Sequence, residues 1–183
     1  MTEQELLDLA ERTGFDHAGM MNTGALFFEP AVREMCAADR CRNYGRSWAC
    51  PPACGTLEEI SEKAKRYRRG ILVQSTGQME DDFDLDTIEE TEKLQKDRFY
   101  RFIKELRKAY PDCLPMASGG CRLCESCTYP DAPCRNPELA IPSMEAYGVM
   151  VSKVCMDSGV EYYYGPRTIT YTACVLVEQR NSL

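Results

Sequence analysis

Four cysteines are crowded into a glycine- and proline-rich stretch of the chain, residues 118–142, here called the second cysteine loop. They are Cys121, Cys124, Cys127 and Cys134, with the spacing C-x2-C-x2-C-x6-C. Three thiolates at every third residue can wrap around one corner of a polynuclear cluster, and this triple spacing is typical of [4Fe-4S] sites. The preceding Gly119 and Gly120 let backbone N–H groups approach the sulfurs. The loop therefore predicts an iron–sulfur site.

Another group of four cysteines lies earlier, in residues 36–55, here called the first cysteine loop. They are Cys36, Cys41, Cys50 and Cys54, with the spacing C-x4-C-x8-C-x3-C. This spacing matches no common zinc finger. Arginines accompany the thiols: Arg33, Arg40, Arg42 and Arg46. A four-thiolate cluster is anionic, so nearby guanidinium groups would stabilise it, unless they simply form a solvated face. We predict a second [4Fe-4S] cluster here.

Zinc is the alternative metal for both loops, because it also binds four thiolates. Structural zinc usually pairs two C-x2-C motifs across a longer stretch, which fits the tight triple less well. Cys113 is a reserve ligand, whereas Cys155 and Cys174 lie among apolar residues and are expected to be buried and inert. The only histidine, His17, is expected to be structural.

Charge and hydropathy exclude several classes of protein. The chain has 183 residues, a formal net charge of −7 and a pI near 4.9. Nucleic-acid binders are usually basic because phosphate neutralisation drives their affinity, so no nucleic-acid partner is expected. No apolar run is long enough to span a bilayer, and the acidic start lacks a signal-peptide pattern. We expect a cytoplasmic protein without membrane contact, where a reducing environment favours metal-bound thiols over disulfides.

The apolar pattern predicts an α/β fold, as a single compact domain over residues 1–183 with a mixed sheet, flanking helices and the two cysteine-rich loops. Helices are predicted over 2–12, 30–35, 56–69, 86–110 and 143–157. Strands are predicted over 15–21, 71–75, 113–117, 160–164 and 168–177. Thr2 with Glu5, and Thr56 with Glu59, have the spacing of capping boxes and mark two helix starts.

Several segments together resemble a known family. They are Cys41-x-x-Tyr44-Gly45-x-x-Trp48-x-Cys50-Pro51-Pro52, Gly119-Gly120-Cys121-x-x-Cys124-x-x-Cys127, Tyr129-Pro130-x-x-Pro133-Cys134-Arg135 and Pro142-Ser143-Met144-Glu145-Ala146-x-Gly148. They are similar to segments of a prokaryotic family of predicted metal-binding proteins, domain of unknown function 2284, over roughly residues 15–178. The resemblance implies metal binding through these cysteines, and the family has no settled activity.

Two clusters in a small domain predict a redox function, in which single electrons pass to a redox protein partner, as in an iron–sulfur oxidoreductase. One alternative is an enzyme whose [4Fe-4S] cluster keeps one iron open for sulfur or Lewis-acid chemistry, held by only three cysteines. Acid–base candidates for that chemistry are Glu125, Asp131 and Glu145. The other alternative is a structural or regulatory zinc protein, in which the metals only fold the two loops.

Overall fold

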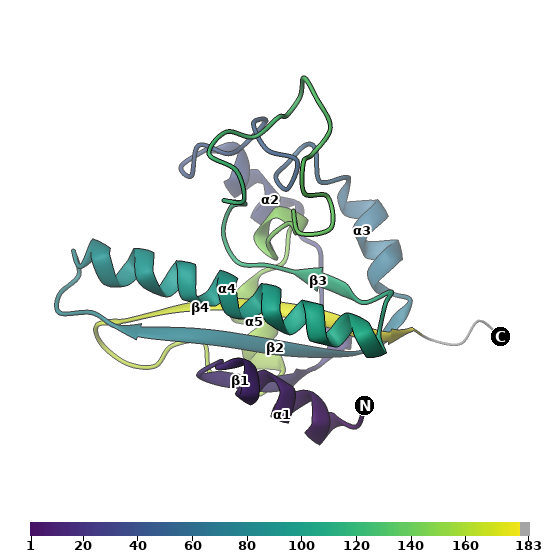
Figure 1. Cartoon of the computed structure of the whole chain (residues 1–183), viewed down its shortest axis with the longest axis vertical. Coiled ribbons are helices and arrows are strands. Elements are labelled where there is room, and N and C mark those ends of the chain that lie inside the picture. Colours follow the sequence, from purple (N-terminus) through teal and green to yellow (C-terminus); the bar gives the residue numbers. More distant parts are fainter. Residues whose placement is uncertain (180–183) are drawn as a thin grey trace.

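A four-stranded antiparallel sheet forms the centre of the molecule, in the order β1-β2-β4-β3 (Figure 1). The computed structural model describes residues 1–179. The strands are β1 (His17–Met21), β2 (Tyr67–Gln78), β3 (Leu114–Met116) and β4 (Thr168–Gln179). The long strands β2 and β4 pair over their whole length, from Tyr67 opposite Gln179 to Gln78 opposite Thr168. This pair is the frame on which the rest of the molecule is built.

Helices cover both faces of the sheet. They are α1 (Glu3–Thr13), α2 (Pro30–Ala37), α3 (Leu57–Ala64), α4 (Leu85–Ala109) and α5 (Val151–Asp157), with the 3-10 turns η1 (Thr23–Ala25) and η2 (Glu145–Tyr147). Both predicted capping boxes form, with Thr2 and Thr56 as N-caps. Among the described residues, no helix is long and apolar enough to cross a membrane.

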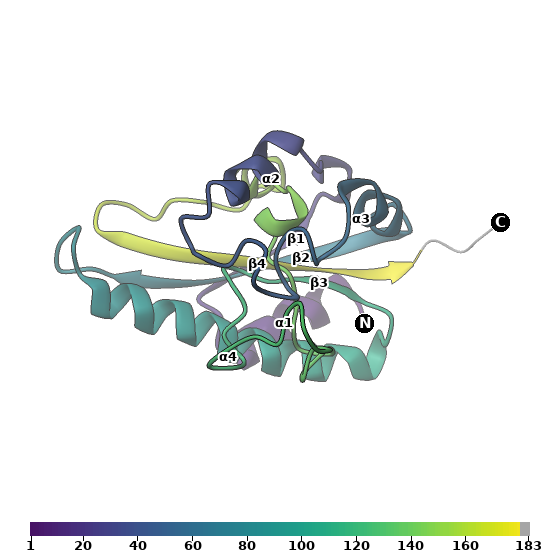
Figure 2. The same cartoon turned by 90° about the horizontal axis from the view of Figure 1, so that it is seen from above.

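Two apolar layers sandwich the sheet, which is why the middle of β2 is apolar on both faces. On one face, Ile71, Val73 and Val175 pack in the layer that contains α1 and α4. On the other face, Leu72 and Leu176 pack in the layer that contains α3 and α5. Figure 2 shows α1 and α4 on one side of the sheet and α2 and α3 on the other. Most of this core comes from helices and strands outside the two cysteine loops.

The α/β class is confirmed, but the predicted mixed sheet is wrong. All three strand pairings, β1 with β2, β2 with β4 and β3 with β4, are antiparallel. Alternation of helices and strands along the chain does not fix strand direction, because a connection that contains helices can return either way along the sheet. The predicted helix over 56–69 is also too long. It ends at Ala64, because Tyr67, 3% exposed, already pairs with β4.

The helix predicted over 143–157 is interrupted at Gly148. This residue has a φ of +81°, and a Cβ there would lie 2.7 Å from Leu57 Cδ2 and 3.0 Å from the Glu29 carbonyl oxygen. The chain therefore turns between η2 and α5. The strand predicted over 160–164 is absent among the described residues, since this segment instead bonds buried Gln74. Gln74 Nε2 donates to the Glu161 carbonyl oxygen at 3.0 Å.

Both cysteine loops lie at the same end of the molecule, beyond the edge strand β3 (Figure 1). The first loop connects α2 to α3, and the second follows β3. The base of the second loop is closed by two backbone hydrogen bonds. Ala117 N donates to the Pro142 carbonyl oxygen at 2.8 Å, and Met144 N donates to the Ala117 carbonyl oxygen at 2.9 Å. The sheet edge thus fixes where the second loop starts and ends.

Candidate metal centre

The first cysteine loop collects its sulfurs where α2 ends. Cys36 lies in the last turn of α2, and Cys41 and Cys50 follow in the irregular chain beyond it. These three residues line a cavity of about 170 Å³. Gly119 and Gly120 of the second loop form part of the same wall. Residues from both loops therefore enclose this first site.

Cys54 lies beside this cavity and is held by its own contacts. Arg33 Nη2 lies 3.5 Å from Cys54 Sγ and 2.5 Å from the Gly55 carbonyl oxygen. The thiol in turn lies 3.6 Å from the Ala146 carbonyl oxygen in η2. Arg33 was predicted to accompany these thiols, and it contacts one of them directly. A guanidinium donor stabilises the anionic form of a sulfur, as a ligand thiolate requires.

Burial raises the pKa of three thiols in the first loop, those of Cys36, Cys50 and Cys54. Cys50 is 7% exposed, and its pKa is raised to about 11. Burial is the main cause, a hydrogen bond from Ser47 opposes it, and the charges of Cys41, Cys54 and Cys36 add to it. Because their pKa values are raised above 9.0, Cys36, Cys50 and Cys54 are protonated at neutral pH without metal, so metal binding by these residues must release protons.

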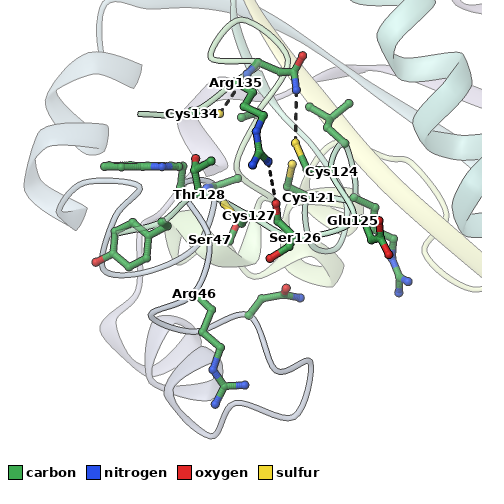
Figure 3. Close-up of a pocket in the computed structure, with 18 of the residues that line it drawn as sticks. Arg46, Ser47, Cys121, Cys124, Glu125, Ser126, Cys127, Thr128, Cys134 and Arg135 are labelled. Carbon is green, nitrogen blue, oxygen red and sulfur yellow. Dashed lines mark hydrogen bonds between the residues drawn. The ribbon is translucent and has the colours of Figure 1, made fainter. Parts of the chain in front are cut away.

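The second cysteine loop surrounds a larger cavity of about 770 Å³ (Figure 3). All four of its cysteines line this cavity: Cys121, Cys124, Cys127 and Cys134. Asn136 binds two of the sulfurs. Its backbone N–H donates to Cys134 Sγ at 3.4 Å, and its side-chain amide donates to Cys124 Sγ at 3.5 Å. Arg135 extends into the pocket and donates to the Ser126 carbonyl oxygen at 2.9 Å (Figure 3).

Cys127 is exposed, and its pKa is nevertheless lowered. Desolvation alone would raise the pKa, but hydrogen bonds to the sulfur outweigh it. The backbone N–H groups of Tyr129, Trp48 and Thr128 contribute to this lowering, and the Ser47 hydroxyl, which has one hydrogen to donate, contributes only when it is not directed at Cys50. Ser47 and Trp48 belong to the first loop. The best-stabilised thiolate of the second loop thus depends on donors from the first.

Cys121 lies on the inner side of the second loop, against α4. Burial raises its pKa, the Leu123 N–H opposes this, and the charges of Cys134, Cys127 and Cys124 add to it. On α4, Glu92 binds Arg122 of the loop at 3.2 Å, and the Glu92 side chain is 14% exposed. This partly buried ion pair connects the second loop to α4, the longest helix.

The hydroxyl of Ser118 gives a test of whether a metal group fits the second site. Ser118 is 5% exposed, and its Oγ has no hydrogen-bond partner among the described residues. Ser118 and Cys121 both border a small void of about 10 Å³. An unpartnered buried hydroxyl is costly, and a ligated sulfur would provide its acceptor. Four thiolates with N–H donors fit either an iron–sulfur cluster or zinc.

Seven of the eight predicted ligand cysteines line one of the two cavities, and Cys54 lies beside the first. Within residues 1–179, no three His, Cys, Asp or Glu side chains stand close enough together to hold a single metal ion as placed. Cys113 packs against the core layer of α4, while Cys155 and Cys174 are buried in the opposite layer, as expected. His17 stacks on Tyr164, with ring centroids 3.9 Å apart, in keeping with a structural role.

Some functional neighbours were not evident from the sequence. Arg42 and Arg46 line the second cavity, although their place in the sequence suggested the first. Asn136 was not singled out, and its only signal was its position two residues after Cys134. Trp48 lies between the two loops, where its ring meets Tyr129 edge-on with centroids 4.9 Å apart.

Comparison with known proteins gives one match. The family model described as predicted metal-binding protein (DUF2284) matches residues 19–177. No curated protein and no solved structure matches the chain. The matched range includes all eight cysteines at the two cavities, the N–H donors that face their sulfurs and the helix that anchors the second loop. The chain therefore belongs to the DUF2284 family of predicted metal-binding proteins.

Proposed function

We propose that this protein binds two [4Fe-4S] clusters, one at each cysteine loop, and exchanges electrons with a redox protein partner. The ligands of the first cluster are Cys36, Cys41, Cys50 and Cys54, and those of the second are Cys121, Cys124, Cys127 and Cys134. The observation that supports this most is the grouping of the sulfurs. Three thiols of the first loop line one cavity and all four of the second loop line the other, and N–H groups face sulfurs in both loops.

A bound [4Fe-4S] cluster supplies reversible one-electron chemistry. The chain's own residues hold it and adjust its charge. Asn136 and Arg33 direct N–H groups at ligand sulfurs, which stabilises the extra negative charge of a reduced centre. In the first site Cys50 is buried and Cys41 is exposed, while exposed Cys127 gives the second site an open edge. We infer that a partner docks at this second edge.

Cys41 supports transfer between the two sites within the molecule. It lines the first cavity with Cys36 and Cys50, and it also lines the second cavity with the cysteines of the other loop. Two centres that share a wall residue are close neighbours, so an electron that enters at the second site has a short way to the first one. The pair would then act as a two-step relay rather than as two separate carriers.

The test is the content of iron and acid-labile sulfide in protein purified without oxygen, together with its visible spectrum. We expect about eight irons and eight sulfides per chain, with broad brown absorption. Two zinc ions without sulfide would contradict the cluster proposal and support the zinc alternative. As a control, the Cys113→Ser variant should keep the full content, because Cys113 lines neither cavity.

A second candidate is an enzyme with an open iron at the first site. Two observations favour it: Cys54 is not in the wall of the first cavity, and Glu145 is. Glu145 is exposed at this cavity, where its carboxyl group is accessible to solvent. The Cys54→Ala variant separates the two functions. A relay loses the first cluster in this variant, whereas an open-iron enzyme keeps it.

A further inference from the structure

The two cysteine loops exchange wall residues. Gly119 and Gly120 of the second loop border the cavity of Cys36 and Cys50. Conversely, Trp48 of the first loop borders the cavity of the second-loop cysteines. Neither site is complete without a segment of the other loop, although each loop carries its own four cysteines.

Direct contacts fix this exchange, and Trp48 makes most of them. Its indole Nε1–H donates to the Ala132 carbonyl oxygen at 3.1 Å, in the middle of the second loop. Its ring packs against Tyr129 at 90°, with centroids 4.9 Å apart. Ser47 and Trp48 also line the same cavity as Cys127. One short segment of the first loop therefore sets the path of the second loop beside a ligand.

Close packing adds a second point of contact. A Cβ on Gly120 would lie 2.6 Å from Asn43 Nδ2, so the backbone of the second loop lies directly against this amide. The same Nδ2 donates to the Cys41 carbonyl oxygen at 3.0 Å. Asn43 thus connects the backbone next to Cys41 with the backbone next to Cys121.

The Ser47–Trp48 segment is also tied to a ligand of the first site. Cys50 N donates to the Ser47 carbonyl oxygen at 3.1 Å, and Ala49 N donates to Ser47 Oγ at 3.3 Å. Ser47 and Ala49 are 4% and 2% exposed. A metal bound by Cys50 would order this tight, buried turn, and the turn would then hold Trp48 in its contact with Ala132 of the second loop.

We infer that the two metal centres load as a linked pair, with Trp48 as the positioning residue through which each centre raises the other's affinity for its metal. The inference rests on the proposed metal binding by both loops, but not on which metal they hold. Linkage is reciprocal, so occupancy of either centre must change the affinity of the other by the same factor.

The experiment measures the chelator concentration that removes half of the metal from each centre, in metal-loaded full-length protein, with the centres distinguished by their spectra. In Cys50→Ala, which lacks a first-centre ligand, we expect the second centre to lose its metal at a chelator concentration 5- to 150-fold lower, roughly the usual range of coupling between sites. In Cys124→Ala, the first centre should shift by the same factor.

Trp48→Phe is the variant that tests the route of the linkage. It keeps an aromatic ring but removes the Nε1–H bond to Ala132. We therefore expect the chelator midpoint of the second centre to fall by a smaller factor than in Cys50→Ala, and the spectrum of the centre that Cys127 ligates to change. Tyr163→Phe, at an aromatic residue that is 64% exposed and lines neither cavity, should change nothing. Circular dichroism identifies any variant that has unfolded. If a cysteine variant is unfolded, the chelator midpoint of Trp48→Phe decides whether the two centres are linked.

The inference is overturned if Cys50→Ala and Trp48→Phe both hold second-centre metal with the wild-type chelator midpoint. It is also overturned if the shifts in Cys50→Ala and Cys124→Ala differ in sign. Zinc in place of iron and sulfide would contradict the cluster proposal alone, because Cys50→Ala and Cys124→Ala each leave one intact centre, whose zinc release can be titrated without a spectrum. The two failures are therefore distinguishable.

Discussion

The two cysteine loops carry equal numbers of sulfurs in very different surroundings. The first loop lies between α2 and α3, and its Cys50 is 7% exposed. The second loop has no helix or strand within residues 118–142, is held at its base and by side chains such as Glu92 and Trp48, and exposes Cys127. The first loop also exposes Cys41, so the two loops differ in how the fold supports them and in Cys50, which is the one buried cysteine of the eight. The proposed electron relay would use the buried Cys50 and the exposed Cys127 as its two ends.

Removal of the metals should have the largest effect, and it should affect the second loop more than the first. Without metal, the second loop has little else to order it, so we expect trypsin to cut at Arg122 or Arg135 before it cuts at Arg40, Arg42 or Arg46 in the first loop. Mass spectrometry of the early fragments checks the order. Arg101 in the middle of α4 is the internal control, since the core does not depend on the loops. If trypsin cuts the first loop before the second, the first loop is the less ordered of the two without metal.

Thiol reactivity in metal-free protein should sharpen the comparison. A thiol reacts as its thiolate, whose fraction falls as pH drops below the pKa. The pKa of Cys50 is about 11 and that of Cys127 is below the ordinary value of 9.0. At pH 8, iodoacetamide should therefore modify Cys127 on the order of 100-fold faster than Cys50. Raising the pH towards 11 should narrow the gap. Equal rates at pH 8 would show that the loops do not differ as described.

A substitution at Gly148 tests how much the first loop depends on the close packing behind η2. Its φ of +81° disfavours a side chain, and a Cβ would meet the Glu29 backbone at 3.0 Å. We expect Gly148→Ala to reduce the free energy of unfolding by about 1–3 kcal/mol, measured by denaturant titration. Gly159 has a φ of +67° with open space around it, so Gly159→Ala isolates the conformational part of the cost. Equal costs for the two variants would argue against the close packing behind η2.

The smallest expected effect is on reduction potential. Asn136→Ala removes the amide that donates to Cys124, which should disfavour the reduced second centre by about 1 kcal/mol. For a one-electron couple, this lowers the potential by about 40 mV. Potentiometric titration checks the shift, with Gln4→Ala on α1 as an exposed control. A change in the reduction potential of the first centre alone would contradict the assignment of Asn136 to the second centre.

Much of the fold could be predicted because its signals are local. The capping boxes at Thr2 and Thr56 predicted the starts of α1 and α3, and the apolar run Ile71–Val73 predicted the middle of β2. The errors arose where distant partners decide the outcome. Tyr67 leaves a helix-like stretch because β4 offers it a partner, and Gly148 interrupts a helix because Glu29 and Leu57 lie against it.

The sequence spacing also grouped the cysteines, since the members of each group are close along the chain. It could not predict which residues cross from one loop to the other. Trp48 reaches Ala132, 84 residues away, and Arg46 borders the cavity of the other loop. Asn43 lies against Gly120 for the same reason. Such contacts depend on the sheet edge that brings the loops together, and no local pattern encodes them.

The most direct test of the account is a reductive titration of anaerobically purified protein, followed by electron paramagnetic resonance. The account predicts uptake of about two electrons per chain, one at each centre, and two signals that broaden each other because the centres are neighbours. Addition of an oxidised redox protein should then return both centres to the oxidised state. Protein that takes up no electrons, or that loses its metal without any such signal, would contradict the proposed relay.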